Sequence, residues 1–215
     1  MTLPKPDVVD LETWNNAVAE QRKREDALGE QIASVNAARK RLPMTPLEGD
    51  FTFTDADGEH SLVDLFHGKH QLVVYHFMYG PDWKKGCPVC TRYMSGLGND
   101  FAGYIEGRDA RFVLVSRAPI QTLNAWAAEK GIVAPWYSGS TEFSQATDAT
   151  DGDNDMGGFS VLYRDDENNI YRTYKPDFSG EIQVTGDLIL QLTPYGRQVK
   201  DDEVPAGWPQ PFSVY

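Results

Sequence analysis

Residues 71–106 read QLVVYHFMYGPDWKKGCPVCTRYMSGLGNDFAGYIE, and the rest of the chain is organised around them. The apolar run from Leu72 to Tyr79 predicts a buried strand. A short loop then leads to two cysteines, Cys87 and Cys90, in the first turn of a predicted helix. Pro88 suits the first helical position, because its fixed φ fits there and its missing N–H is not needed.

Beyond the second cysteine, apolar residues recur every three or four positions, which predicts one continuous helix with a single buried stripe. The stripe consists of Cys90, Met94, Leu97, Phe101 and Ile105. Cys90 therefore points into the core, while Cys87 caps the helix and faces outward. Such an asymmetry suits a pair of redox-active thiols.

Two effects favour a thiolate at Cys87. The unsatisfied N–H groups at a helix start carry partial positive charge, and Lys84 and Lys85 lie within three residues. We therefore expect Cys87 to be the attacking nucleophile and Cys90 to resolve the mixed disulfide.

A CxxC motif can also be half of a zinc site, or an inert pair. Zinc usually takes four ligands, and the chain has only two cysteines. His76 is the only histidine near them, and a histidine in a strand is more often a hydrogen-bonded core residue. Redox chemistry is the favoured interpretation, and we predict no metal and no cofactor.

The composition sets limits on partners and location. The 215 residues carry a formal charge of −12 with 40% hydrophobic residues, which indicates a globular protein that binds neither nucleic acid nor anionic membranes. No apolar run approaches the roughly 20 residues that span a bilayer. The first residues lack the apolar core of a secretory signal. We therefore expect a cytoplasmic protein.

The N-terminal region predicts a long helix. Asp10 is its expected cap, basic residues 39–41 lie in its last turn, and Pro43 follows its end. A straight helix of this length measures roughly 45 Å, more than a compact domain can cover. Either the helix bends near residues 21–29 and folds onto its own domain, or it packs on a second subunit as a homodimer.

The segments on either side of the cysteines alternate between strands and helices. Residues 51–53 predict a strand, the Asp57-Gly58 pair a hairpin turn, and residues 61–66 a short helix. Residues 111–116 predict a second buried strand, followed by a helix from Pro119 that Gly131 closes. This order indicates an α/β protein with parallel strands.

The last third of the sequence is more polar. Residues 134–137 predict a short strand and residues 138–158 a long acidic loop. Residues 159–164 and 170–174 predict an antiparallel hairpin. Residues 181–192 could form a last helix, and the proline-containing residues 193–215 an extended tail.

This order of elements is similar to the thioredoxin fold with the N-terminal hairpin of its peroxiredoxin-like members. Five segments resemble a largely uncharacterised bacterial family of thioredoxin-like proteins, labelled as predicted dithiol-disulfide oxidoreductases. They are YHFMYGPDWKKGCPVC (75–90), FVLVSRAP (112–119), PWYSG (135–139), FSVLYRD (159–165) and LTPYGR (192–197).

The resemblance implies an α/β fold with a central mixed sheet flanked by helices. The thioredoxin-like domain would span residues 44–192, between an N-terminal helical extension at 1–43 and an extended C-terminal tail at 193–215. Only Cys87 and Cys90 carry over as catalytic residues. Trp83 matches the motif without an assigned role.

Two departures from related families bear on the activity. Thioredoxins place a cis-proline just before the hairpin strand, where this chain has Gly157-Gly158. Peroxiredoxins place a threonine three residues before their reactive cysteine, where this chain has Lys84. Arg117 follows the second strand at the edge where such sheets place their sites. It either lies near the cysteines or forms a surface salt bridge.

Three functional hypotheses follow. The first is a thiol-disulfide oxidoreductase that acts on a small disulfide or on one dedicated thiol partner protein. The second is a thiol peroxidase, in which Cys87 becomes a sulfenic acid that Cys90 condenses with. The third is a non-enzymatic binding or scaffold protein that retains the fold, with an inert cysteine pair.

Overall fold

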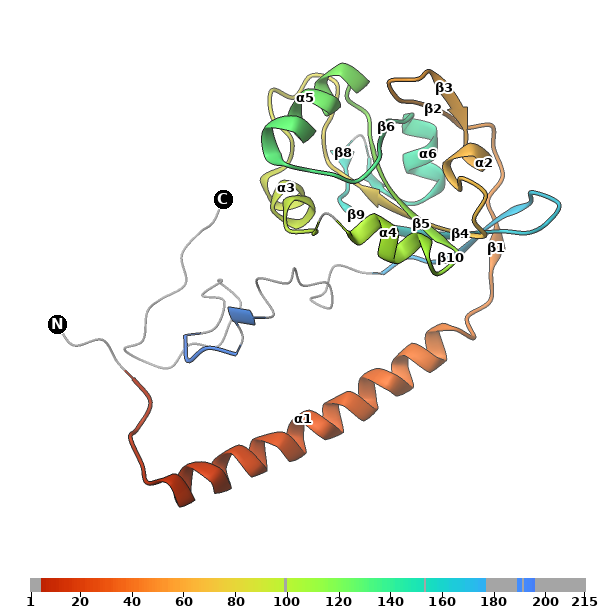
Figure 1. The fold of residues 1–215 in the computed structure, drawn as a ribbon. Coiled ribbons are helices and arrows are strands. Elements are labelled where there is room, and N and C mark those ends of the chain that lie inside the picture. Colours follow the sequence, from red (N-terminus) through yellow and green to blue (C-terminus); the bar gives the residue numbers. More distant parts are fainter. Residues whose placement is uncertain (1–4, 99, 153, 177–188, 191, 196–215) are drawn as a thin grey trace. The chain divides into compact units, whose positions relative to one another are not determined.

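The computed structural model describes residues 5–98, 100–152, 154–176, 189–190 and 192–195. These residues divide between two units. One contains the N-terminal helix, and the other, which begins at Met44, contains the sheet and the cysteines (Figure 1). In the part of the chain that the structure describes, no helix is both long and apolar enough to cross a membrane.

The N-terminal helix α1 spans Leu11–Arg39. Its predicted cap is confirmed, because the Asp10 carboxylate accepts a hydrogen bond from the Thr13 N–H at 2.8 Å. The helix continues through Gly29 without a break, so its 29 residues measure about 44 Å. The homodimer through this helix, and the domain boundaries at residues 43 and 192, stay predictions.

Among the described residues, the main sheet of the second unit has eight strands. Their order is β1 (Thr45–Pro46), β10 (Ile170–Tyr174), β9 (Gly158–Arg164), β4 (Gln71–His76), β5 (Ala110–Ser116), β6 (Trp136–Ser138), β2 (Thr52–Thr54), β3 (Glu59–Ser61).

The strand directions confirm the thioredoxin-like fold. Strand β4 lies at the centre, parallel to β5 and antiparallel to β9, which in turn pairs antiparallel with β10. Strand β5 also pairs in parallel with β6. The predicted hairpin, β2–β3, joins the far edge of β6. Helix α3 carries the CxxC motif between the parallel strands β4 and β5, and a CxxC in such a βαβ unit is typical of thioredoxin-like proteins.

Helices cover both faces of this sheet (Figure 1). Helices α3 (Pro88–Ser95), α4 (Phe101–Glu106) and α5 (Ile120–Lys130) contribute to one buried cluster, while α2 (Leu62–Leu65) and α6 (Thr141–Ala146) contribute to the other. Side chains alternate along β4, so Val74 belongs to the α2 and α6 side and Tyr75 to the cysteine side. The predicted mixed sheet flanked by helices is therefore confirmed.

The prediction of one helix from Pro88 to Ile105 is wrong. Helix α3 ends at Ser95 with Gly96 as its cap, and α4 begins at Phe101. Glycine costs more conformational entropy in a helix than other residues, and a second glycine at position 98 adds to that cost. The apolar stripe nevertheless stays on one side, because Leu97, Phe101 and Ile105 all pack on the cluster that contains Cys90.

The prediction of a loop at residues 138–158 is also wrong. The segment contains α6 and a small hairpin of β7 (Thr150–Asp151) and β8 (Asn154–Asp155). Ser140 caps α6 by accepting a hydrogen bond from the Phe143 N–H at 3.3 Å, and the Phe143 ring is fully buried. One buried aromatic residue thus anchors a segment whose composition is otherwise polar. The predicted last helix and C-terminal tail lie largely outside the described residues.

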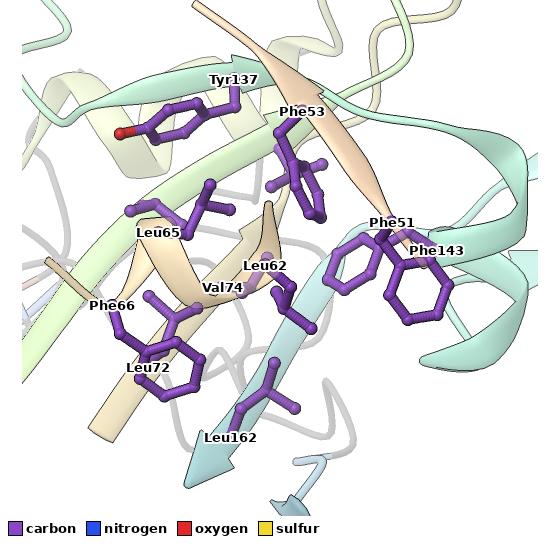
Figure 2. Close-up of a cluster of buried hydrophobic side chains, with 12 residues drawn as sticks. Phe51, Phe53, Leu62, Leu65, Phe66, Leu72, Val74, Tyr137, Phe143 and Leu162 are labelled. Atoms are coloured by element: carbon purple, nitrogen blue, oxygen red, sulfur yellow. The ribbon is translucent and has the colours of Figure 1, made fainter. Parts of the chain in front are cut away.

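Figure 2 shows the cluster that Phe143 completes on this face of the sheet. Its ring meets Phe53 edge-on at a centroid distance of 4.8 Å and Phe51 at 5.3 Å. These contacts attach α6 to β2 and to the chain before it. This cluster contains neither cysteine, so its side chains contribute to the stability of the fold and not to the cysteine site.

We expect Phe143→Ala to lower the free energy of unfolding by about 3–5 kcal/mol, because it leaves a cavity among aromatic rings. Chemical denaturation followed by fluorescence measures this loss. Val133→Ala is the matched control: Val133 is exposed, so its truncation should change the free energy by less than about 0.5 kcal/mol. Equal effects of the two substitutions would contradict the assignment of Phe143 to the core.

Candidate active site

The CxxC motif lies at the end of the central strand, where backbone hydrogen bonds fix both ends of its loop. Strand β4 ends at His76, three residues earlier than predicted, although the Phe77 N–H still donates to the Val115 carbonyl at 2.9 Å. The Cys87 N–H donates to the Met78 carbonyl at 3.0 Å, and the Ala118 N–H donates to the Tyr79 carbonyl at 2.8 Å. The loop at residues 80–86 is thereby closed at its base, and Cys87 is placed beside the sheet edge.

Gly86 allows the chain to approach the core just before the first cysteine. A Cβ atom at this position would lie 2.8 Å from the Phe77 ring, 2.9 Å from the Trp126 indole nitrogen and 3.1 Å from the Tyr79 ring. No side chain fits in that space without displacing an aromatic ring. Glycine is therefore required for Cys87 to reach its position.

Cys87 is the N-cap of α3, with Pro88 at the first helical position, as predicted. The Thr91 hydroxyl donates to the Cys87 carbonyl at 2.8 Å and accepts a hydrogen bond from the Trp126 indole N–H at 3.1 Å. This chain of hydrogen bonds connects the start of α3 to α5. The backbone around Cys87 is therefore fixed, while its side chain remains partly accessible.

The two cysteines are free thiols that lie 3.6 Å apart. Cys90 is only 2% exposed, which confirms the predicted asymmetry of the pair. The Cys90 S–H donates a hydrogen bond toward Cys87, and this bond lowers the pKa of Cys87 to about 6. The amide groups of Cys90 and Val89 at the helix start lower the same pKa further, although neither makes a cap hydrogen bond of good geometry.

The pKa of Cys90 moves in the opposite direction. It is raised well above its ordinary value, first because the Cys90 thiol serves as donor to Cys87 and second because it is buried. The pair therefore has one accessible thiolate and one buried, protonated thiol near neutral pH.

The predicted supporting residues lie on the surface beside Cys87. Lys84 and Lys85 are exposed and are not among the groups that lower the pKa of Cys87, contrary to our expectation. Trp83 is 43% exposed, and a Cβ atom on Gly80 would lie 3.0 Å from its ring. The loop thus presents one aromatic and two basic side chains to solvent.

Arg117 forms an ion pair with an acidic residue of the small hairpin. Its Nε donates to the Asp155 carboxylate at 2.6 Å, and another of its nitrogens donates to the Thr141 hydroxyl at 3.2 Å. The ion pair is partly buried and connects the end of β5 to β8. The salt bridge is therefore present, at a partly buried position, and a role of Arg117 beside the cysteines stays a prediction.

His76 is a core residue, as expected for a histidine in a strand. Its Nε2 lies 2.9 Å from the Ser160 hydroxyl, and burial lowers its pKa to about 3, so the ring is neutral at physiological pH. Its ring packs against Phe143, on the face of the sheet opposite the cysteines. Among the described residues, no group of three or more histidine, cysteine or acidic side chains could bind a metal ion.

Two residues near Cys90 were not predicted to belong to the site. Gly157 faces it directly: a Cβ atom there would lie 3.4 Å from the Cys90 sulfur and 3.3 Å from the Met78 sulfur. The one sequence signal that pointed to Gly157 was the comparison with thioredoxins, which have a proline at this position.

The second is Tyr75, which the apolar run of β4 gave no reason to single out. Its hydroxyl is buried beside Cys90 and has no hydrogen-bond partner of good geometry among the described residues. An orphaned buried donor of this kind costs about 1–3 kcal/mol.

Comparison with protein families gives one match, to a family described as "Bacterial protein of unknown function (DUF899)", over residues 3–211. The chain belongs to this family. A comparison with curated proteins found no match.

Solved structures with a similar fold include the peroxidoxin BcpB from Mycobacterium tuberculosis, with 15% identity, a TM-score of 0.42, and coverage of 60% of this chain and 82% of that one. Peroxiredoxin Q from Xanthomonas campestris has 18% identity and a TM-score of 0.41, covering 68% and 89%. A PrxQ variant from Xylella fastidiosa has 17% identity and a TM-score of 0.40, covering 67% and 87%. At such low scores and identities, these likenesses say nothing about the activity of this chain.

We expect alkylation by iodoacetamide to label Cys87 first, with a rate that falls as the pH drops through about 6, because only the thiolate reacts. Peptide mapping identifies the labelled residue. Cys90→Ala removes the hydrogen bond to the thiolate and should move the midpoint to higher pH, while Cys90→Ser retains a donor and should move it less. Preferential labelling of Cys90 would contradict the assignment of the two roles.

We expect Gly86→Ala to destabilise the fold and to slow alkylation of Cys87, because the added methyl group displaces the rings of Phe77 and Tyr79 or the cysteine itself. Gly98→Ala is the matched control, since a Cβ atom there meets nothing within 4 Å. Thermal unfolding and the alkylation rate measure the two effects. A Gly86→Ala protein that reacts and unfolds like the Gly98→Ala protein would show that Gly86 does not position Cys87.

Proposed function

We propose that the protein is a thiol-disulfide oxidoreductase that cycles Cys87 and Cys90 between the dithiol and the disulfide. The observation that supports this proposal is the difference in accessibility and protonation between the two cysteines. One thiol is accessible, has a lowered pKa and begins a helix, while its partner 3.6 Å away is buried and protonated. An inert pair of cysteines gains nothing from this difference. Disulfide exchange uses the accessible thiolate as the attacking group and the buried thiol as the resolving group.

The reaction has two steps. The Cys87 thiolate attacks one sulfur of a disulfide R–S–S–R, forming Cys87–S–S–R and releasing RS⁻. Cys90 then loses its proton to solvent, and its thiolate attacks the Cys87 sulfur, forming the Cys87–Cys90 disulfide and releasing the second RS⁻. The protein gives up two electrons and the disulfide accepts them. An external dithiol restores the reduced pair by the same steps in reverse.

The surroundings of the cysteines favour a small anionic disulfide over extended peptides. Gly157 lies at the position from which thioredoxins present a cis-proline to substrate, and no peptide bond among the described residues is cis. Lys84 and Lys85 are exposed beside Cys87 in a chain of net charge −12. Such a local basic patch attracts anions by electrostatic steering. Oxidised glutathione has the required size and charge, and a single dedicated protein partner remains the alternative.

Peroxide reduction is less well supported. It needs donors fixed around the peroxide oxygens as their bond breaks. Arg117, the candidate donor, is occupied by Asp155 and Thr141. Lys84, at the position of the peroxiredoxin threonine, is exposed on the loop. We therefore expect reaction with hydrogen peroxide to be no faster than that of a free thiolate.

We expect the reduced protein to exchange with oxidised glutathione faster than with cystamine, a cationic disulfide of similar chemistry, and to reduce insulin weakly. The preference should shrink at high salt and on Lys84→Glu/Lys85→Glu substitution, because the steering is electrostatic. Trapping with acid followed by chromatography measures the released thiol.

Cys87→Ser should abolish exchange, and Cys90→Ser should accumulate the mixed disulfide. The proposal fails if the wild type exchanges no faster than glutathione itself. Rapid peroxide consumption that Arg117→Ala abolishes would instead identify a thiol peroxidase. An inactive protein in both assays would favour the non-enzymatic hypothesis.

A further inference from the structure

The second step of the proposed reaction places a negative charge on Cys90, in buried surroundings that disfavour a charge. Cys90 must become a thiolate to attack Cys87, yet it is 2% exposed and packed among apolar and aromatic side chains. Burial disfavours the charged form of a thiol and raises its pKa. A nearby donor that stabilises the Cys90 thiolate would therefore accelerate this step.

Tyr75 provides a donor at the required place. It is the fifth residue of β4, and its side chain projects to the cysteine face of the sheet. The ring is fully buried, at 4.8 Å from the Phe159 ring and 6.4 Å from the Phe77 ring, so it cannot swing toward solvent. Its hydroxyl is consequently fixed within the protein, beside the Cys90 sulfur.

In the dithiol state the hydroxyl makes no hydrogen bond of good geometry with any described group, although buried tyrosines usually find a hydrogen-bond partner. The titratable groups that act on it are Cys90, Cys87 and Tyr93. Burial, the largest effect, raises the pKa of Tyr75, so the hydroxyl retains its proton throughout the working pH range and remains a donor.

We propose that the Tyr75 hydroxyl is the hydrogen-bond donor to the Cys90 thiolate when Cys90 resolves the mixed disulfide. In the dithiol state the hydroxyl makes no hydrogen bond of good geometry with the described residues. A charged sulfur accepts a stronger hydrogen bond than a neutral thiol, so the hydroxyl stabilises the thiolate more than the thiol. In agreement, the neighbouring Tyr75 hydroxyl acts as a donor that lowers the pKa of Cys90, against the effect of burial. This role rests on the proposed function, because it concerns only the second step of disulfide exchange.

The two steps can be measured separately with 5,5′-dithiobis(2-nitrobenzoate), an anionic disulfide that releases a coloured thiolate in each. Attack by Cys87 releases the first equivalent, and attack by Cys90 releases the second. In single-turnover mixing, we expect Tyr75→Phe to leave the first phase within about twofold of wild type and to slow the second about tenfold or more, as for loss of one donor to a charged group. The pH profile of the second phase should move to higher pH.

A stability measurement distinguishes this role from a structural one. Tyr75→Phe keeps the ring and removes a buried hydroxyl that makes no hydrogen bond of good geometry within the described part of the chain, so the thermal midpoint should stay constant or rise. Tyr137→Phe, which alters a buried tyrosine in the opposite cluster, should leave both phases unchanged. Incorporation of 3-fluorotyrosine at position 75 makes the hydroxyl a stronger donor and should move the second-phase profile to lower pH.

The inference is overturned if Tyr75→Phe leaves the second phase within about twofold of wild type. It is equally overturned if both phases slow together, or if 3-fluorotyrosine has no effect. Failure of the proposed function has a different signature: wild-type protein would then release no second equivalent, or release the first no faster than free glutathione does.

Discussion

The site depends on one short contact, the hydrogen bond from the buried thiol of Cys90 to the sulfur of Cys87. Two thiolates at 3.6 Å would repel each other in surroundings of low dielectric constant, so the first proton to leave determines the pKa of the second. Accessibility and the helix start both favour Cys87 as the charged partner. The rest of the local structure fixes this contact: the Cys87–Met78 backbone hydrogen bond closes the loop, and Gly86 lets the chain pass beneath three aromatic rings.

The charges around the site act at two different ranges. Amides at the start of α3 and the Cys90 thiol touch the thiolate and determine its pKa. Lys84 and Lys85 extend into water, where the solvent screens their effect on proton affinity. Their field still extends over several ångströms beyond the surface, which is the distance at which an approaching anion is steered. In the proposed reaction, substrate attraction and thiol activation would therefore depend on separate residues, even though all of them lie within four positions of the first cysteine.

Local patterns predicted the parts of the structure that local interactions determine. The proline at the helix start and the glycine that closes α5 each indicate a backbone state directly, and both were confirmed. The apolar run correctly predicted strand β4 but placed its end three residues too late. The prediction failed where a tertiary contact decides the conformation, as at Phe143, whose burial organises a polar segment into α6.

Periodicity likewise could not reveal the break between α3 and α4, because the apolar stripe continues across it. The position of Tyr75 in the site could not be predicted for a related reason. A tyrosine in an apolar run is expected to be an ordinary core residue until the surroundings of its hydroxyl are known.

For the proposed disulfide exchange, the size of the pKa shift of Cys87 indicates which of the two steps gains most from the site. Lowering the pKa of Cys87 from 9.0 to about 6 raises its thiolate fraction at pH 7 from about 1% to about 90%. The intrinsic nucleophilicity of a thiolate falls with its pKa, and a Brønsted coefficient of about 0.4–0.5 removes roughly 15- to 30-fold of that gain. The first step therefore gains only a factor of about three to six. Intramolecular attack by a positioned group can contribute much more than this. In the proposed reaction the larger rate gain would therefore come from the attack by Cys90, and the obstacle to that attack is the charge that Cys90 has to carry in a buried position.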